Sequence, residues 1–287
     1  MKIRNLLNKI ARLITQIIQL ILSVIQRKEV SVLSVLYSFP LYTPNSMGSY
    51  EDRSKLTIQT INQVFPSLNS LAKSFNKKTL KITDIEALSQ SADDVAALDD
   101  LKFLFNKYGS DKADHNYHNF YGTVLKNRDE ITAVFEVGLG TNNTDIVSTM
   151  GKYGKPGASL RAFRDFLPKA KIFGADIDKR VLFSEDRIET FYVDQTKPES
   201  FIGLQNSIPD NSFDLIIDDG LHSPDANALT LNFGLSKIKV GGWVAVEDTS
   251  VNKIPFWEIV CALLPDQYES YMFKAHEGLI FAVKRVY

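Results

Sequence analysis

The sequence predicts an α/β fold in which helices cover both faces of a mostly parallel, seven-stranded sheet, preceded by a mostly helical accessory segment. Two observations predict this class. From residue 131 onward, short apolar runs rich in β-branched and aromatic residues alternate with stretches of helical pattern. Acidic residues and glycines follow several of these runs, where the strands of a parallel sheet would end at a common edge.

The predicted elements follow one another regularly along the second half of the chain. We expect strands over residues 133–137, 171–176, 187–192, 213–218 and 243–247, and a final pair over 268–273 and 279–285. One helix is expected over residues 159–167, where Pro168 ends it, and another over 257–264. Between the last two parallel strands, a helix begins at Ser223 with Pro224 in its first turn, and Lys237 and Gly241 follow its end.

The first hundred residues differ from this pattern. Residues 1–28 predict a basic amphipathic helix, because apolar residues recur at helical spacing and Lys and Arg are the only charged residues before Glu29. Gln16 and Gln19 interrupt the apolar run, which is therefore too short to span a membrane. The helix either lies in a membrane interface or packs on protein, since amphipathicity alone does not distinguish these partners. Residues 29–105 predict an accessory region, with helices over 57–64 and 85–105 and a short strand over 79–82, and residues 106–287 the main domain.

The composition favours a small-molecule or glycan partner. A net charge of -1 and a pI near 6.4 give no excess of Lys and Arg for binding nucleic acid phosphates. The single cysteine, Cys261, excludes an internal disulfide and favours a reducing compartment. We expect a cytoplasmic protein, peripheral to the inner face of a membrane if residues 1–28 bind lipid, and a homo-oligomer if they bind a second copy.

The end of the first predicted strand indicates a cofactor that has no phosphate. Gly138 and Gly140 let the backbone approach a ligand closely, but the third glycine and the immediate helix of a dinucleotide site are missing. Glu136 is placed to hold an ammonium group, Asp176 to accept ribose hydroxyls and Asp194 to face an adenine amino group. Any one of these acids alone could be a solvated loop residue, whereas three at successive strand ends favour a binding site.

Two neighbouring strands each end in a pair of acids, Asp218 with Asp219 and Glu247 with Asp248. Carboxylates brought together repel one another unless a cation compensates them, so we expect Mg²⁺ or another hard divalent ion here. His222, three residues past Asp219, is a candidate general base for a hydroxyl, although a lone histidine could equally cap the following helix. Neighbours on a strand point in opposite directions, so we group Asp218 with the supporting, cofactor-side residues.

These motifs, in this order and spacing, resemble one known family. Over residues 108–249 the chain is similar to the metal-dependent sugar O-methyltransferases of macrolide biosynthesis, of the mycinamicin and macrocin type, and to the related cephalosporin-hydroxylase-like proteins. The elements that carry the resemblance are Tyr108-Gly-Ser110-Asp-Lys112, Glu136-Val-Gly138-Leu-Gly140, Gly157-Ala-Ser-Leu-Arg161, Gly174-Ala-Asp176-Ile-Asp178, Asp194-Gln195, Asp218-Asp-Gly-Leu-His222 and Glu247-Asp248.

The resemblance implies a class I methyltransferase fold, with S-adenosylmethionine as the cofactor. It also implies that Asp219, Glu247 and Asp248 bind Mg²⁺ and that His222 is the general base. On this reading Asp219 and His222 are the catalytic pair.

The resemblance further implies that the segment from Gly109 to Tyr121 covers the cofactor, with Ser110 and Lys112 in contact with it. Without the resemblance, the aromatic residues of this segment predict one face of a packed element. Leu221 departs from the family, which usually has a small Ser at this position. The identity of the acceptor is therefore not inferred from the resemblance.

The leading hypothesis is a Mg²⁺-assisted, S-adenosylmethionine-dependent O-methyltransferase that acts on a hydroxyl of a sugar, a glycan or a secondary metabolite. A phenol or catechol acceptor is an alternative, because a metal with an adjacent base would activate those oxygens too. A non-catalytic binding protein that keeps the fold is a second alternative. An NAD-dependent oxidoreductase is disfavoured, because the third glycine and the immediate helix are missing.

Overall fold

The computed structural model describes residues 42–75, 77–88 and 92–287. The chain divides into two compact units, the first ending at Leu71 and the second spanning Ala72–Tyr287. The predicted amphipathic helix over residues 1–28 lies outside the described residues. Among the helices that are described, none is long and apolar enough to cross a membrane.

The described part of the first unit is dominated by helix α2 (Tyr50–Ser74), which continues to the start of the second unit. The Ser49 hydroxyl accepts a hydrogen bond from the backbone N–H of Asp52 at 3.2 Å and so caps the helix. Glu51 and Asp52 lie in the first turn, where they favour the helix dipole. The predicted helix stopped at residue 64, whereas α2 continues through Pro66.

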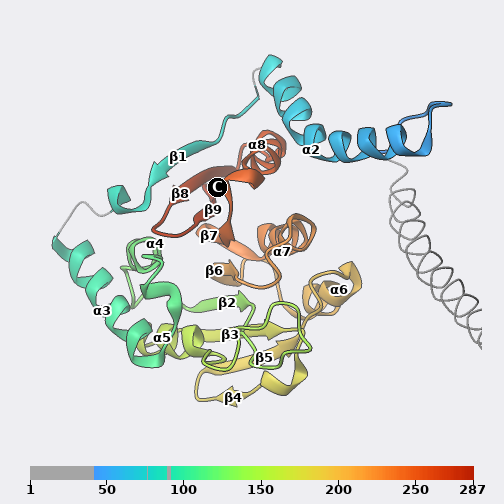
Figure 1. The fold of residues 1–287 in the computed structure, drawn as a ribbon. Helices are drawn as coiled ribbons and strands as arrows, with labels where there is room; N and C mark the ends of the chain where they lie inside the picture. Colours follow the sequence, from blue (N-terminus) through green and yellow to red (C-terminus); the bar gives the residue numbers. More distant parts are fainter. Residues whose placement is uncertain (1–41, 76, 89–91) are drawn as a thin grey trace, which may run out of the picture. The chain divides into compact units, whose positions relative to one another are not determined.

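The second unit is built on a nine-stranded sheet with the order β1-β8-β9-β7-β6-β2-β3-β5-β4 (Figure 1). Its centre is a set of five parallel strands, namely β2 (Ala133–Val137), β3 (Lys171–Asp176), β5 (Ile188–Tyr192), β6 (Phe213–Asp218) and β7 (Ile238–Thr249). Next to β7, the strand β9 (Leu279–Arg285) runs antiparallel to both β7 and β8 (Tyr268–Lys274). The strand order reverses between β2 and β6, which is where such sheets bind ligands.

Two short edge strands complete the sheet beyond the seven strands expected in the main domain, and the first of them overlaps the short strand expected over residues 79–82. β1 (Lys81–Asp84) pairs in parallel with β8, and β4 (Ser184–Glu185) pairs antiparallel with β5. All their side chains are exposed, so neither strand shows the alternation of a half-buried strand. Because β1 joins the main sheet, the compact unit begins earlier in the chain than the predicted domain start at residue 106.

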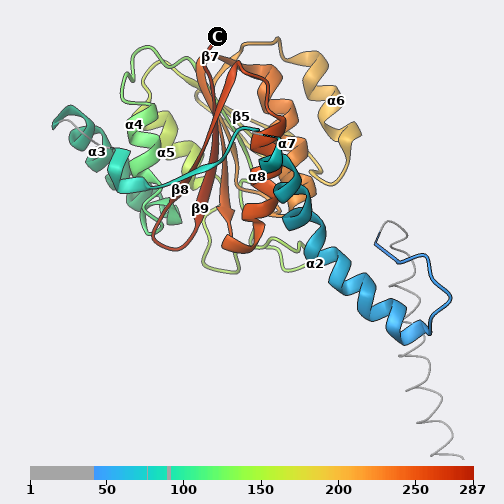
Figure 2. The same ribbon diagram turned by 90° about the horizontal axis from the view of Figure 1, so that it is seen from above.

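Helices cover both faces of the sheet (Figure 2). One face carries α3 (Ala92–Tyr108), α4 (His118–Val124) and α5 (Ala158–Phe166), and the other carries α6 (Pro198–Ser207), α7 (Pro224–Lys237) and α8 (Ile254–Leu263). Short 3-10 helices occur at η1 (Ile85–Leu88), η2 (Asp111–Ala113), η3 (Lys179–Val181) and η4 (Val251–Lys253).

Each face of the sheet has its own apolar core. Phe105 and Phe163 are buried on the α3 to α5 side, and Phe233 and Trp257 on the α6 to α8 side. Burial of the central strands on both faces explains their nearly continuous apolar sequences. The predicted α/β class with a mostly parallel sheet is confirmed.

Candidate functional site

A cavity of about 590 Å³ opens at the carboxyl ends of the parallel strands. Several of the predicted site residues line it: Ser110, Lys112, Gly138, Gly140, Asp176, Asp194, Asp219, His222 and Asp248. Three others are buried and do not line it: Glu136, Asp218 and Glu247. The strand-end residues singled out in the sequence therefore gather in one region, with some at the cavity wall and others behind it.

Gly138 allows the ends of β2 and β6 to meet. Its φ of 99° lies in the region that favours glycine, and a Cβ at this position would lie 2.0 Å from the carbonyl oxygen of Asp219. The N–H of Asp219 donates to the carbonyl of Val137 at 2.8 Å, which joins the two strand ends. Gly138 thus brings Asp219 beside the glycine loop as well as leaving room for a ligand.

Asp176 and Asp194 lie on the same side of the cavity as this loop. The carboxylate of Asp176 accepts the backbone N–H groups of Leu139 and Asp178, each at 2.8 Å. Asp194 accepts the hydroxyl of Thr196 at 2.6 Å and pairs with Lys197 at 2.8 Å. These contacts give each carboxylate a structural role. Each carboxylate also keeps lone pairs that are available to a ligand, as the predicted binding role requires.

Asp218 supports the turn that follows β6. Its carboxylate is fully buried and accepts hydrogen bonds from Gln195 Nε2 at 2.8 Å and Asn227 Nδ2 at 3.1 Å. The side-chain oxygen of Gln195 accepts the N–H of Leu221 at 2.8 Å. Asp218 therefore acts through Gln195 to hold the residues that present His222.

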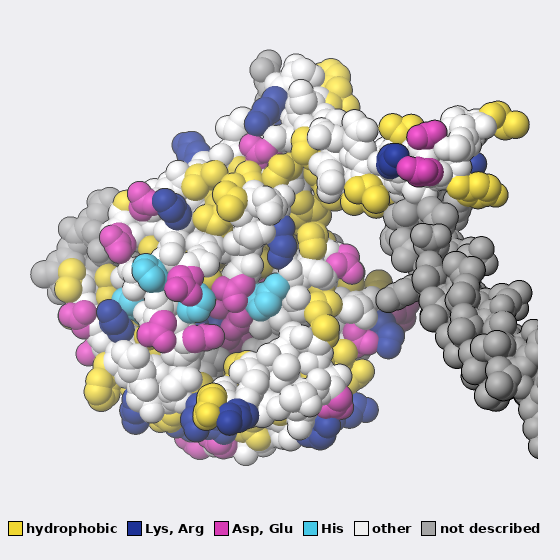
Figure 3. Space-filling view, viewed as in Figure 1, with side chains coloured by type: hydrophobic (Ala, Val, Ile, Leu, Met, Phe, Trp, Pro, Cys, Tyr) yellow, Lys and Arg dark blue, Asp and Glu magenta, His cyan; other side chains and the backbone are white. Residues whose placement is uncertain are grey.

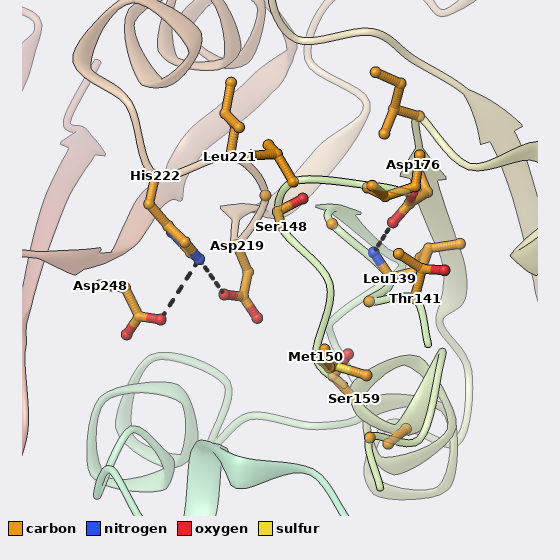
Figure 4. Close-up of a pocket in the computed structure, with 18 of the residues that line it drawn as sticks. Leu139, Thr141, Ser148, Met150, Ser159, Asp176, Asp219, Leu221, His222 and Asp248 are labelled. Carbon is orange, nitrogen blue, oxygen red and sulfur yellow. Dashed lines mark hydrogen bonds and ion pairs between the residues drawn. The ribbon is translucent and has the colours of Figure 1, made fainter. Parts of the chain in front are cut away.

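Asp219, His222 and Asp248 converge at the cavity wall (Figure 4). Nε2 of His222 lies 3.8 Å from Oδ1 of Asp219 and 3.6 Å from Oδ2 of Asp248. One ligand atom from each of the three residues lies within 4.8 Å of the others, a spacing at which a metal ion could be held. His222 and Asp248 have φ values of 55° and 51°, an uncommon left-handed backbone that is concentrated at functional sites.

Glu247 lies behind this group of three. Its Oε2 is 2.6 Å from Nζ of Lys112, and its Oε1 accepts the hydroxyl of Tyr121. Lys112 also pairs with Oδ2 of Asp219 at 2.5 Å and with Glu136 at 3.1 Å. Lys112 was predicted to contact the cofactor, but its ammonium group is directed at carboxylates.

Tyr117 orients Asp248. Its hydroxyl donates to Oδ1 of Asp248 at 2.5 Å, and burial raises the pKa of the phenol, so it remains a neutral donor. The contacts of Tyr117 and Tyr121 with the acids were not expected from the sequence. Their spacing of four residues, which puts both on one helical face, was the available signal.

The electrostatic character of the site is negative. On the face shown in Figure 3, acidic side chains and histidines gather in one area, although the net charge of the whole chain is only -1. A concentration of carboxylates attracts cationic ligands. This suits both a metal ion and a cofactor with a positive charge.

Comparison with known proteins gives sequence matches of limited length. No family model matches the chain. It is 28% identical over 178 residues to an 8-demethyl-8-alpha-L-rhamnosyl tetracenomycin-C 2'-O-methyltransferase of Streptomyces olivaceus, which covers 61% of this chain and 44% of that protein. It is 33% identical over 103 residues to the mycinamicin VI 2''-O-methyltransferase of Micromonospora griseorubida, which covers 34% of this chain and 25% of that protein. The chain thus matches less than half the length of these relatives.

A solved structure of similar fold is the MycE methyltransferase from the mycinamycin biosynthetic pathway, in complex with Mg and SAH. The two share 22% sequence identity at a TM-score of 0.51, over 65% of this chain and 55% of that one. The fold is that of a class I methyltransferase. The predicted resemblance to the sugar O-methyltransferases is confirmed by the sequence matches.

Proposed function

We propose that this protein is an S-adenosylmethionine-dependent, Mg²⁺-assisted O-methyltransferase that acts on a hydroxyl of a sugar, in a glycan or a secondary metabolite. The observation that carries the proposal is that a single cavity joins the glycine loop after β2 to the group formed by Asp219, His222 and Asp248. A cofactor on the glycine loop and an acceptor at His222 would share that space. The sequence similarity to sugar O-methyltransferases supports the choice of acceptor class.

The residues at the glycine loop fit the cofactor. Gly138 and Gly140 leave backbone open to the cavity, Asp176 and Asp194 offer carboxylate oxygens, and the apolar Ile177 also lines the wall. S-adenosylmethionine supplies a methyl group on a positively charged sulfur. Asp176 would accept the ribose hydroxyls and Asp194 would face the adenine amino group, while buried Glu136 adds negative charge beneath the amino-acid end.

The oxygen-rich end of the cavity fits a hard divalent ion. The front oxygens of Asp219 and Asp248 face the same point, and Glu247 lies behind them. We propose Asp219 and Asp248 as Mg²⁺ ligands through these front oxygens, with Glu247 as the third ligand once it exchanges its contact with Lys112 or Tyr121 for the ion. A divalent cation held there would lower the pKa of an acceptor hydroxyl.

His222 is proposed as the general base. Nε2 is directed toward the two acids and the cavity, where an acceptor hydroxyl would lie (Figure 4). With the cofactor bound, His222 would take the proton of the acceptor hydroxyl as the oxygen accepts the methyl group, and S-adenosylhomocysteine would be the product. Gln195 and Tyr117 hold the turn and the neighbouring acid that define this position.

The test uses purified full-length protein with S-adenosylmethionine, Mg²⁺ and a panel of glycosides, glycans and phenols, with methylated products detected by mass spectrometry. We expect products from sugar acceptors, their loss in EDTA and their return with Mg²⁺. Asp219→Asn should lower turnover by at least about a hundredfold while S-adenosylhomocysteine still binds. Full activity in EDTA would refute the metal role, and methylation of phenols alone would refute the sugar acceptor.

A further inference from the structure

Lys112 is a fully buried lysine in contact with three acids. Its side chain is 1% exposed, and its Nζ lies 2.5 Å from Asp219 Oδ2, 2.6 Å from Glu247 Oε2 and 3.1 Å from Glu136 Oε1. An ammonium group has three N–H donors. Two of them have a carboxylate acceptor, in Asp219 and Glu247, and Glu136 lies close enough to complete the cluster as an ion-pair partner.

The charge of Lys112 is secured by these neighbours. A lysine is positively charged at neutral pH, and the carboxylates of Asp219, Glu247 and Glu136 around Nζ compensate for its removal from water. Buried carboxylates that lack a cation repel one another and favour protonation. Lys112 therefore supplies a permanent positive charge inside the acidic cluster.

The contacts divide the oxygens of the cluster into two sets. Lys112 and two tyrosines occupy the rear oxygens, which are Asp219 Oδ2, both oxygens of Glu247 and Asp248 Oδ1. The front oxygens, Asp219 Oδ1 and Asp248 Oδ2, face His222 instead. Lys112 thus fixes which oxygen of Asp219 is presented to the cavity.

We propose that Lys112 is a built-in counter-ion that holds the acid cluster together in the metal-free protein and limits its affinity for a divalent cation. This inference rests on the proposed function, since it concerns the acids assigned to the metal. The ammonium group and a cation would share Asp219 and Glu247, and like charges a few ångströms apart weaken each other's binding. Lys112 is a positioning residue on this account, and not the cofactor contact expected from the sequence.

The test compares full-length Lys112→Met with wild type by calorimetric titration with Mg²⁺ and by thermal unfolding in EDTA and in excess Mg²⁺. Removing the charge should tighten Mg²⁺ binding by about tenfold or more. The melting temperature should fall in EDTA and be largely restored by Mg²⁺. Lys152→Met is the matched control, because Lys152 is exposed and contacts only the ring of Tyr153 among the described residues; its Mg²⁺ affinity should equal that of wild type.

A second variant keeps the proposal testable if Lys112→Met does not fold. Lys112→Met combined with Glu136→Gln removes one negative charge together with the positive one, so it should fold and unfold in EDTA at a higher temperature than the single variant. Failure of this rescue, or Mg²⁺ binding by Lys112→Met that is unchanged or weaker, would overturn the counter-ion role. Absence of Mg²⁺ binding in wild type would instead overturn the proposed metal site.

Discussion

Tyr117 and Tyr121 lie one helical turn apart and each donates a hydrogen bond to one of the two acids at the end of β7. A phenol donates a single hydrogen bond to a carboxylate oxygen and adds no charge of its own, so it orients the acid without pairing with it as an ion. Burial raises the pKa of both phenols, which keeps their protons in place at neutral pH. The direction in which Asp248 faces His222 therefore depends on a neutral side chain from a distant part of the chain.

Leu221 lies in the proposed acceptor pocket, at the position where the sugar O-methyltransferases that the chain resembles usually have a small Ser. Its side chain lines the cavity immediately before His222 (Figure 4), while its N–H is held by Gln195. Leu221→Ser removes apolar contact area and leaves this anchor intact. We expect the KM for the acceptor to rise by about tenfold, because apolar contacts of this size contribute about 1 to 3 kcal/mol to discrimination.

Steady-state kinetics with the best acceptor from the panel measures this effect. The KM for S-adenosylmethionine should stay unchanged, since the hydrogen bond from the Leu221 N–H to Gln195 keeps the turn beside Gly138 in place. Leu263→Ser, on a leucine that is 76% exposed on α8, is the control and should leave both constants unchanged. An unaltered acceptor KM in Leu221→Ser would mean that this side chain does not contact the acceptor.

Among the elements, the loop between β2 and α5 forms the outer wall of the cofactor side. Asn142 holds it closed, because its Nδ2 donates to the carbonyls of Gly151 at 2.5 Å and Gly154 at 3.0 Å. Met150 folds back over Gly140, where a Cβ would lie 2.2 Å from the sulfur of Met150. Asn142 therefore ties the far end of the loop to its start, beside the backbone hydrogen bond from Met150 to Thr141 at 2.9 Å.

Asn142→Ala should loosen this loop without disturbing the core. We expect the Kd for S-adenosylhomocysteine to rise by about tenfold, which corresponds to about 1.4 kcal/mol and is the scale of one or two lost hydrogen bonds. Calorimetry measures the affinity, and hydrogen exchange of residues 143–156 should become faster. Asn206→Ala, on an exposed position of α6, is the control. If the affinity remains at the wild-type value, the loop is held by its other contacts.

The central elements could be predicted from sequence because buried parallel strands are continuous apolar runs with polar ends. The ranges of β2, β3, β6 and β9 are those expected. The short exposed strand β4 carries no such pattern and was not expected, whereas β1 was expected two residues earlier in the chain. Helix α2 passes through a proline that would normally end a helix.

The candidate site likewise has a part that could be predicted from the sequence and a part that could not. The approach of Asp219, His222 and Asp248 follows from strand ends that share one edge. The contacts of Lys112 could not be predicted in this way. Lys112 lies 135 residues before Glu247, and no periodic pattern in the sequence relates the two.

At the scale of the whole molecule, the α3 and α4 side of the sheet contains a histidine that makes stability depend on pH. His118 is 5% exposed at the start of α4. Burial, together with the positive charge of Lys102, lowers its pKa to about 4. The unfolded chain, in which the pKa is near the usual 6.5, therefore binds a proton more readily than the folded protein between these two values.

It follows that the free energy of unfolding falls as the pH drops from about 6.5 toward about 4, and that this contribution is fully present above about pH 6.5. In His118→Gln, the glutamine at position 118 does not titrate in this window. Between about pH 7.5 and about pH 5, wild type should lose about 2 kcal/mol more stability than His118→Gln, measured by urea unfolding at each pH. His276→Gln, on a histidine that is 65% exposed, should lose as much as wild type. Equal losses in wild type and His118→Gln would show that His118 is protonated in the folded protein as readily as in the unfolded chain.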